Sequence, residues 1–76
     1  MERFTRIQRD IGIMGGKACI KGTRVTVGMI VAQIGGGKSV NELLSEYPYL
    51  KKADILQALR YAAWSVEAKE AEIAFA

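Results

Sequence analysis

Local stop signals divide the C-terminal two-thirds of this 76-residue chain and restrict it to separate helical segments. The glycines at 35–37 follow an apolar segment and end it, because glycine adopts the positive φ of a helix C-terminus without strain. Ser39 opens the next segment with Glu42 three residues later, the spacing of a capping box. Pro48 ends that segment, since the residue before a proline avoids helical geometry. The chain is therefore predicted to form one helix before residue 35, a second from Ser39 and a third after the proline.

The third helix is predicted to begin near Lys51 or Lys52 and to run to about Glu70. Asp54 falls in its first turn, where a carboxylate suits the positive end of the helix dipole. The apolar residues recur at spacings of four, three and four, which places them on one stripe facing the core. They are Ile55, Leu59, Ala62 and Val66, with Leu56 and Ala63 alongside.

The first 27 residues carry strand signals. Residues 3–13 alternate loosely between apolar and charged side chains, as a short edge strand does. Residues 18–20 are apolar and residues 25–27 are β-branched, and Lys21 and Gly22 between them indicate a small hairpin. The helical pattern begins at residue 28.

These segments add up to a mainly α chain with a small β element, in which short N-terminal strands precede a three-helix, helix-turn-helix unit. We expect a single domain over residues 1–76, with the strands in 1–27, the helix-turn-helix core in 28–66 and an acidic helix end and tail in 67–76. A monomer of this length buries only about 60% of its unfolded surface, which favours a homodimer.

Charge is distributed unevenly along the chain, whose net charge is +3. The first 26 residues carry six Lys or Arg against two acids, whereas residues 67–76 carry one lysine against three acids. A basic front suits a polyanion, and the acidic end suits a different partner. Solvated polar faces would give the same gradient.

Composition disfavours several classes of function. The apolar runs are far shorter than the ~20 residues of a membrane helix, and charged residues interrupt the N-terminus where a signal peptide is apolar, so we expect a cytoplasmic protein. With no histidine and the single cysteine Cys19, neither a metal site nor an activated thiol is expected. Residues 35–39 end like a P-loop, but its first glycine would fall at Ala32. We expect no cofactor and no catalytic activity.

The helix-turn-helix pattern directs attention to the start of the third helix, which in such motifs offers side chains to base edges. Lysine can bind guanine or phosphate, and glutamine carries the donor and acceptor that match adenine. The residues predicted to contact DNA there are Lys51, Lys52, Gln57 and Arg60. A second set is predicted to form a basic arm along the phosphates, namely Arg3, Arg6, Arg9, Lys17 and Lys21. Ordinary solvated residues would have the same pattern.

Three other side chains are candidates for binding a protein partner. Trp64 lies off the apolar stripe, so it packs in a dimer, under the N-terminal strand or against another protein. Glu67 and Phe75 belong to the acidic end. The tyrosines on either side of Pro48, of which Tyr47 is the first, are expected to pack the turn.

Arg24 is expected to have a structural role. It follows Gly22 and Thr23 in a turn between the strands of the predicted hairpin. Its guanidinium would bind loop carbonyls or a carboxylate and so hold the hairpin against the helices.

A set of short motifs closely resembles a known family. The motifs are Gly16-Lys17, Ile20-Lys21-Gly22-Thr23-Arg24-Val25, Gly37, Ser39, Glu42-Leu43-Leu44, Tyr47-Pro48, Leu50, Asp54-Ile55, Ala58-Leu59 and Tyr61-Ala62-Ala63. Together they resemble domain of unknown function family 433, a group of small bacterial and archaeal proteins that are similar to the VapB-type antitoxins of toxin–antitoxin pairs. The resemblance covers about residues 7–63. It implies a compact winged or homeodomain-like helix-turn-helix fold, usually dimeric, that binds a PIN-like nuclease toxin and operator DNA.

The chain departs from the family pattern at three places. Ala18 stands where a proline is usual, and Lys51 stands where a Thr or Ser cap is common. Loss of such a cap costs about 1 kcal/mol. The tail after Glu67 holds no arginine, whereas VapB-like inhibitors often direct a cationic side chain at the acidic metal site of the toxin.

Two functions follow as hypotheses. In the first, the protein is an antitoxin-like regulator that binds operator DNA through the helix that begins at Lys51, and binds a PIN-like nuclease toxin through its acidic end. In the second, it is a dimeric protein-interaction module without DNA binding, in which Trp64 and the tail hold the partner.

Overall fold

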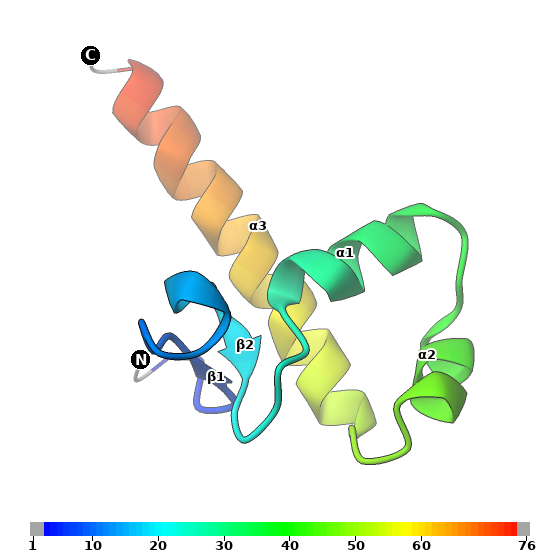
Figure 1. Ribbon diagram of the computed structural model, residues 1–76. Coiled ribbons are helices and arrows are strands. Elements are labelled where there is room, and N and C mark those ends of the chain that lie inside the picture. The colour runs from blue at the N-terminus through cyan, green and yellow to red at the C-terminus, as the bar shows by residue number, and fades with distance from the viewer. Residues whose placement is uncertain (1–2, 75–76) are drawn as a thin grey trace.

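The computed structural model describes residues 3–74 of the chain, and the side-chain surroundings of residues 3–71. In the described range, strands β1 (Ile7–Gln8) and β2 (Cys19–Ile20) precede three helices, α1 (Val27–Gly35), α2 (Val40–Glu46) and α3 (Lys52–Ala74). The long α3 crosses the molecule, with the strands and α1 against its first half and α2 beside its start (Figure 1). The predicted fold class, mainly helical with a small N-terminal β element, is confirmed.

The helix boundaries follow local signals. The Ser39 hydroxyl accepts the Glu42 backbone N–H at 3.1 Å, and the Glu42 carboxylate accepts the Ser39 backbone N–H at 3.0 Å, so the predicted capping box forms. Tyr47 ends α2 with a φ of −122° and a ψ of 75°, outside helical geometry as expected before Pro48. At the start of α1, the hydroxyl of Thr26 accepts the backbone N–H of Met29 at 3.0 Å.

The β element differs from the predicted hairpin. Strand β2 pairs with β1 instead, with Ile7 opposite Ile20 in an antiparallel register. The predicted partner at 25–27 forms only an isolated bridge, between Cys19 and Thr26. Because Thr26 is the N-cap of α1, the chain turns into a helix at the point where the second strand of a hairpin would continue.

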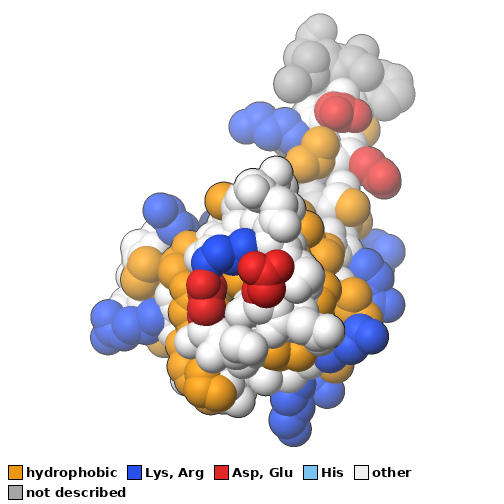
Figure 2. Space-filling model, turned by 90° about the vertical axis from the view of Figure 1, so that its right-hand side faces the viewer, with side chains coloured by type: hydrophobic (Ala, Val, Ile, Leu, Met, Phe, Trp, Pro, Cys, Tyr) orange, Lys and Arg blue, Asp and Glu red, His pale blue; other side chains and the backbone are white. Residues whose placement is uncertain are grey.

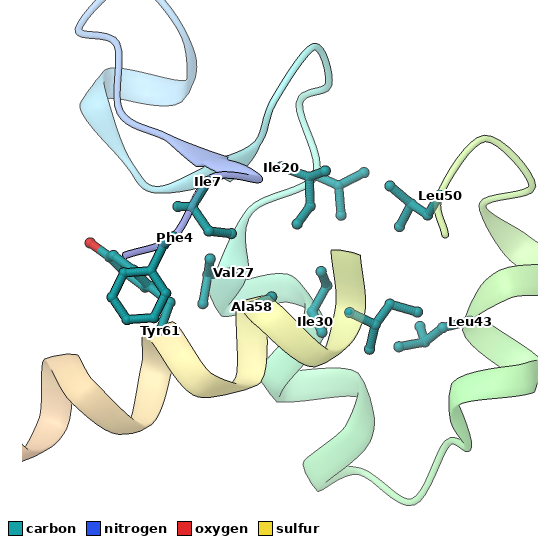
Figure 3. Close-up of a cluster of buried hydrophobic side chains, with 11 residues drawn as sticks. Phe4, Ile7, Ile20, Val27, Ile30, Leu43, Leu50, Ala58 and Tyr61 are labelled. Carbon is teal, nitrogen blue, oxygen red and sulfur yellow. The ribbon is translucent and has the colours of Figure 1, made fainter. Parts of the chain in front are cut away.

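One hydrophobic core joins all the elements (Figure 3). Its side chains come from the N-terminal segment, the two strands, the β2–α1 loop, the three helices and the α2–α3 turn: Phe4, Ile7, Ile20, Val25, Val27, Ile30, Leu43, Leu50, Ile55, Ala58 and Tyr61. In α3 the buried face runs through Ile55, Ala58 and Tyr61, whereas Leu56 and Val66 of the predicted stripe are 42% and 56% exposed. The stripe prediction was thus partly wrong.

Beyond Ala62, α3 leaves the body of the molecule. Every side chain from residue 63 to residue 71 is exposed, and the ribbon continues away from the other elements (Figure 1). We call residues 63–74 the projecting half of α3 and residues 52–62 its packed half.

Candidate nucleic-acid interface

The turn between α2 and α3 presents two lysines. Residues 47–51 join the helices, Lys51 precedes the first residue of α3, and Lys52 is that residue. Both side chains are exposed. Within the described part of the chain, neither ammonium group has a hydrogen-bond or ion-pair partner, so both are available to an anion.

Asp54 holds the start of α3 in place. Its carboxylate accepts the backbone N–H of Lys51 at 2.8 Å, which is the half of a capping box that the third helical residue contributes. The other carboxylate oxygen lies 3.0 Å from Nη1 of Arg6. Asp54 is 7% exposed, so its charge is largely withdrawn from water and paired.

Two predicted DNA-binding residues serve the fold instead. The backbone N–H of Arg6 donates to the side-chain carbonyl of Gln57, and the Arg6 guanidinium donates to Asp54. The amide oxygen of Gln57 therefore accepts a hydrogen bond inside the fold, and the predicted pairing of this residue with adenine would have to share that oxygen. Arg6 likewise anchors the N-terminal segment to α3 and is not a free member of a phosphate-binding arm. Arg6 is separated in the sequence from Gln57 by 51 residues and from Asp54 by 48, so no local sequence pattern predicts these contacts.

The outer face of α3 carries a different strip of side chains. Lys52, Leu56 and Arg60 are all exposed and follow one another at a spacing of four, which puts them on one side of the helix. The sequence pattern placed Leu56 beside the apolar stripe that faces the core, and its place in this strip was missed. The charged residues four positions before and after it, Lys52 and Arg60, could have indicated that this side of the helix is exposed.

The remaining cations are exposed but do not form one arm. Lys21 borders a hollow of about 260 Å³, together with Thr23 and Asp54. Arg9 and Lys17 border a different hollow, between α1 and α3. On the face that carries α2, acidic side chains lie near the middle with a basic side chain between them, and other basic side chains are scattered around the edges (Figure 2). The predicted basic arm is thus divided between several sides of the molecule.

The loop after β2 is fixed by Thr23 rather than by Arg24. Gly22 has a φ of +76°, which favours glycine, and the hydroxyl of Thr23 donates to the carbonyl of Ile20 at 2.8 Å. The same hydroxyl accepts the backbone N–H of Val25 at 3.0 Å. Arg24 is exposed and has no hydrogen-bond or ion-pair partner among residues 3–71. The prediction that Arg24 holds this region against the helices was therefore wrong, and Arg6 takes that role.

Of the tyrosines beside Pro48, Tyr47 packs in the turn as predicted, whereas Tyr49 is 62% exposed. The rings of Tyr47 and Tyr49 lie edge to face, with centroids 6.2 Å apart. The Tyr47 hydroxyl also accepts a hydrogen bond from the side-chain amide of Gln33 in α1, at 3.4 Å.

Trp64 packs under the N-terminal segment, one of the positions weighed for it. Its ring lies 5.8 Å from that of Phe4 and 5.7 Å from that of Tyr61. The side chain is still 39% exposed and borders a shallow hollow of about 420 Å³, which Arg3 and Glu67 also line. Phe75, the third residue predicted to bind a partner, lies outside the described residues.

The acidic side chains of α2 are tied to local partners. Hydrogen bonds from the backbone and the hydroxyl of Ser39 lower the pKa of Glu42, with a smaller contribution from the charge of Lys38. Glu46 forms an ion pair with Lys38. Within the described residues no group of three or more His, Cys, Asp or Glu lies together as a metal site would require, and no helix there is both long and apolar enough to cross a membrane.

The arrangement defines a class of small, mainly helical proteins in which a two-stranded sheet precedes three helices. The sequence pattern of the family described as protein of unknown function (DUF433) matches residues 7–62, and the chain belongs to this family. Among solved structures it is similar to the crystal structure of a DUF433 member protein from Anabaena variabilis, with 38% sequence identity and a TM-score of 0.78. That match covers 91% of this chain and 68% of the other. No curated protein matches the chain.

Proposed function

We propose that this protein is a dimeric, cytoplasmic, antitoxin-like regulator that binds operator DNA through the start of α3. The observation that carries the proposal is the pair of exposed, unpaired lysines, Lys51 and Lys52, at the end of a short turn between two helices. In helix-turn-helix proteins this end of the second helix meets the major groove. Nothing in the described range covers these lysines.

The strip on α3 offers complementary contacts for a base-reading role. Lys52 suits phosphate or guanine, Arg60 suits guanine or a more distant phosphate, and Leu56 between them would pack on a thymine methyl group. Leu56 takes the place that sequence reasoning gave to Gln57. Lys21 and Arg24, both exposed in the loop after β2, would add phosphate contacts from the N-terminal side.

A PIN-like nuclease toxin is the proposed protein partner. The hollow beside Trp64 combines an aromatic side chain, a buried neighbour in Phe4 and charges from Arg3 and Glu67, which is the composition of a binding hot spot. It lies on α3 at some distance along the helix from Lys52. DNA and the nuclease would therefore occupy separate surfaces, so that the regulator could bind its operator and the toxin at the same time.

The test is binding of a labelled duplex taken from the region upstream of the gene, measured by fluorescence anisotropy over a series of salt concentrations. We expect Lys51→Ala with Lys52→Ala to weaken binding at least about tenfold and to lower the salt slope by about 2, because two phosphate-neutralising charges are lost. Lys69→Ala, in the projecting half of α3, is the matched control and should bind as the wild type does. Equal affinity of the double variant and the control would remove α3 from the interface.

The second candidate function is a protein-interaction module without DNA binding. The observation that favours it is that Arg6 and Gln57 form hydrogen bonds within the protein, so fewer of the predicted DNA-binding side chains are free. This candidate predicts no binding of the upstream duplex even at low salt. It also predicts that a nuclease encoded next to the gene co-purifies with the wild type, and that Trp64→Ala disrupts the complex.

A further inference from the structure

An apolar groove lies between α1 and α3, away from the lysines of the proposed DNA surface. It has a volume of about 600 Å³, and its floor includes Val27 and Val31 of α1 and Ala62 and Val66 of α3. Val31 and Val66 are 38% and 56% exposed. Two branched aliphatic side chains open to water within one hollow mark a contact surface rather than a solvated face.

The rim of this groove is basic. Arg9 and Lys17, from the loop between the strands, line its edge and are both exposed. The Arg9 Nε donates to the carbonyl of Gly16 at 2.9 Å, which fixes the loop while leaving the positive charge at the surface. An occupant with apolar side chains and negative charge would match both the floor and the rim.

The projecting half of α3 has the properties that this occupant needs. It spans residues 63–74, its side chains from residue 63 to residue 71 are all exposed, and the contact of Trp64 with Phe4 gives it only limited tertiary support. Most of the stability of a helix in a protein comes from tertiary packing of one face. Glu67 and Glu70 are exposed on it, against the single Lys69. A helix with so little packing inside its own chain gains stability when a second chain packs on it.

The surface area of the chain supports the same conclusion. A compact monomer of 8.3 kDa exposes about 4,600 Å². This chain exposes 5234 Å². The excess, about 600 Å², approaches the ~800 Å² that each partner buries in a stable interface.

We infer that the groove is the homodimer interface, in which two copies cross their α3 helices antiparallel at Val66 and each projecting half lies in the groove of the other copy. One surface holds both the groove and the helix that fills it, so the contact is self-complementary and closes with two-fold symmetry. In this arrangement Glu70 of each copy passes the other copy's Ala62 and meets the rim that carries Lys17. The inference deepens the dimeric part of the proposed function and rests on it.

The interface uses a different face of α3 from the hollow beside Trp64. At 3.6 residues per turn, Trp64 points about 200° away from Ala62, so the dimer leaves Trp64 and Glu67 accessible. The dimer and the proposed complex with a nuclease are therefore compatible.

Sedimentation equilibrium over a wide range of protein concentration tests the inference. We expect a wild-type dimer, and an association constant at least about tenfold weaker for Val66→Glu and for Val31→Glu, since each buries an unpaired charge in the interface. Leu56→Glu is the matched control, because it makes the same kind of change on α3 outside the groove and should leave the dimer intact. Circular dichroism establishes that each variant is folded.

A charge reversal sharpens the test. Lys17→Glu should weaken the dimer, and Lys17→Glu combined with Glu70→Lys should restore most of the loss. A wild-type monomer at every concentration, or a Val66→Glu dimer as tight as the control, overturns the inference. A monomer that still binds the upstream duplex overturns this inference and the dimeric part of the proposed function but leaves the DNA-binding part standing. A dimer that ignores the duplex overturns the DNA-binding part alone.

Discussion

The two halves of α3 belong to one unbroken helix but are stabilised in different ways. In the packed half, Ile55 is fully buried and Asp54 ties the first turn to the N-terminal segment. In the projecting half, the side chains from residue 63 to residue 71 are all exposed. The apolar spacing of a helix in a sequence therefore looks the same whether the rest of the chain covers that face or leaves it exposed.

The largest contrast between the halves should appear in amide hydrogen exchange. At a dilution that favours the monomer, we expect the amides of residues 58–61 to exchange only through global unfolding. The amides of residues 67–71 should open with a free energy close to zero, as fraying helix ends do, well below that of global unfolding. Raising the protein concentration should protect residues 67–71 if the dimer forms. Equal protection of both segments in the monomer would contradict the division of α3 into two halves.

A second contrast concerns side-chain truncation. Ile55→Ala should lower the free energy of unfolding by about 2–5 kcal/mol, because it leaves a cavity in the core. Leu56→Ala, at the adjacent exposed position, should change it by less than about 1 kcal/mol. Urea unfolding followed by circular dichroism measures both. A similar loss for the two variants would mean that the packed half is not packed as described.

The contacts of Asp54 at the start of the packed half should contribute less to the free energy of unfolding than Ile55 does. Asp54→Ala removes a helix cap and one partner of a part-buried ion pair, and we expect it to cost about 2 kcal/mol in urea unfolding. A double-mutant cycle with Arg6→Met should give a coupling energy of about 0.5–1 kcal/mol. Glu46→Ala breaks the exposed pair with Lys38 and serves as the control, with little expected change. If the changes in unfolding free energy of the two single variants add up to that of the double variant, the ion pair contributes nothing to stability.

The smallest expected effect concerns pH and the start of α2. Since its pKa is lowered in the folded protein, Glu42 contributes stability that is fully present above the ordinary carboxyl value of 4.5 and is lost as the pH falls through the lower folded pKa. Thermal unfolding of the wild type and Glu42→Gln over a pH series measures this contribution. The difference between them should shrink at acid pH, where the carboxyl is protonated. A difference that does not change with pH would show that the charge of Glu42 plays no part in the cap.

Local signals predicted the parts of the fold that depend on neighbouring residues. Ser39 and Glu42 make a capping box over three residues, and Pro48 acts on the residue before it. The start of α3 at Lys52 and the place of the Asp54 carboxylate in its first turn were also predictable from neighbouring residues. Each depends on backbone geometry over less than two turns, so the sequence pattern alone was sufficient.

The candidate site was less predictable because its availability depends on distant partners. Lys51 and Lys52 were predicted to contact DNA, and the structure leaves both side chains exposed. Gln57 and Arg6 looked equally suitable in the sequence, but they bind each other across 51 residues. No periodicity reports a contact of that kind.

The sequence by itself determined where α1 ends, where α2 begins and ends and where α3 begins, because caps, glycines and proline act over a few bonds, and it placed the chain in its family through short motifs. The end of α3 was predicted near Glu70 but lies at Ala74. Only the tertiary structure decided which faces of those helices are covered. Burial depends on how far the neighbouring elements reach along α3, and among the described residues Ala62 is the last whose side chain they cover enough to be at least half-buried. That limit separates Ile55, which lies in the core, from Val66, which carries the same apolar signal and is left exposed.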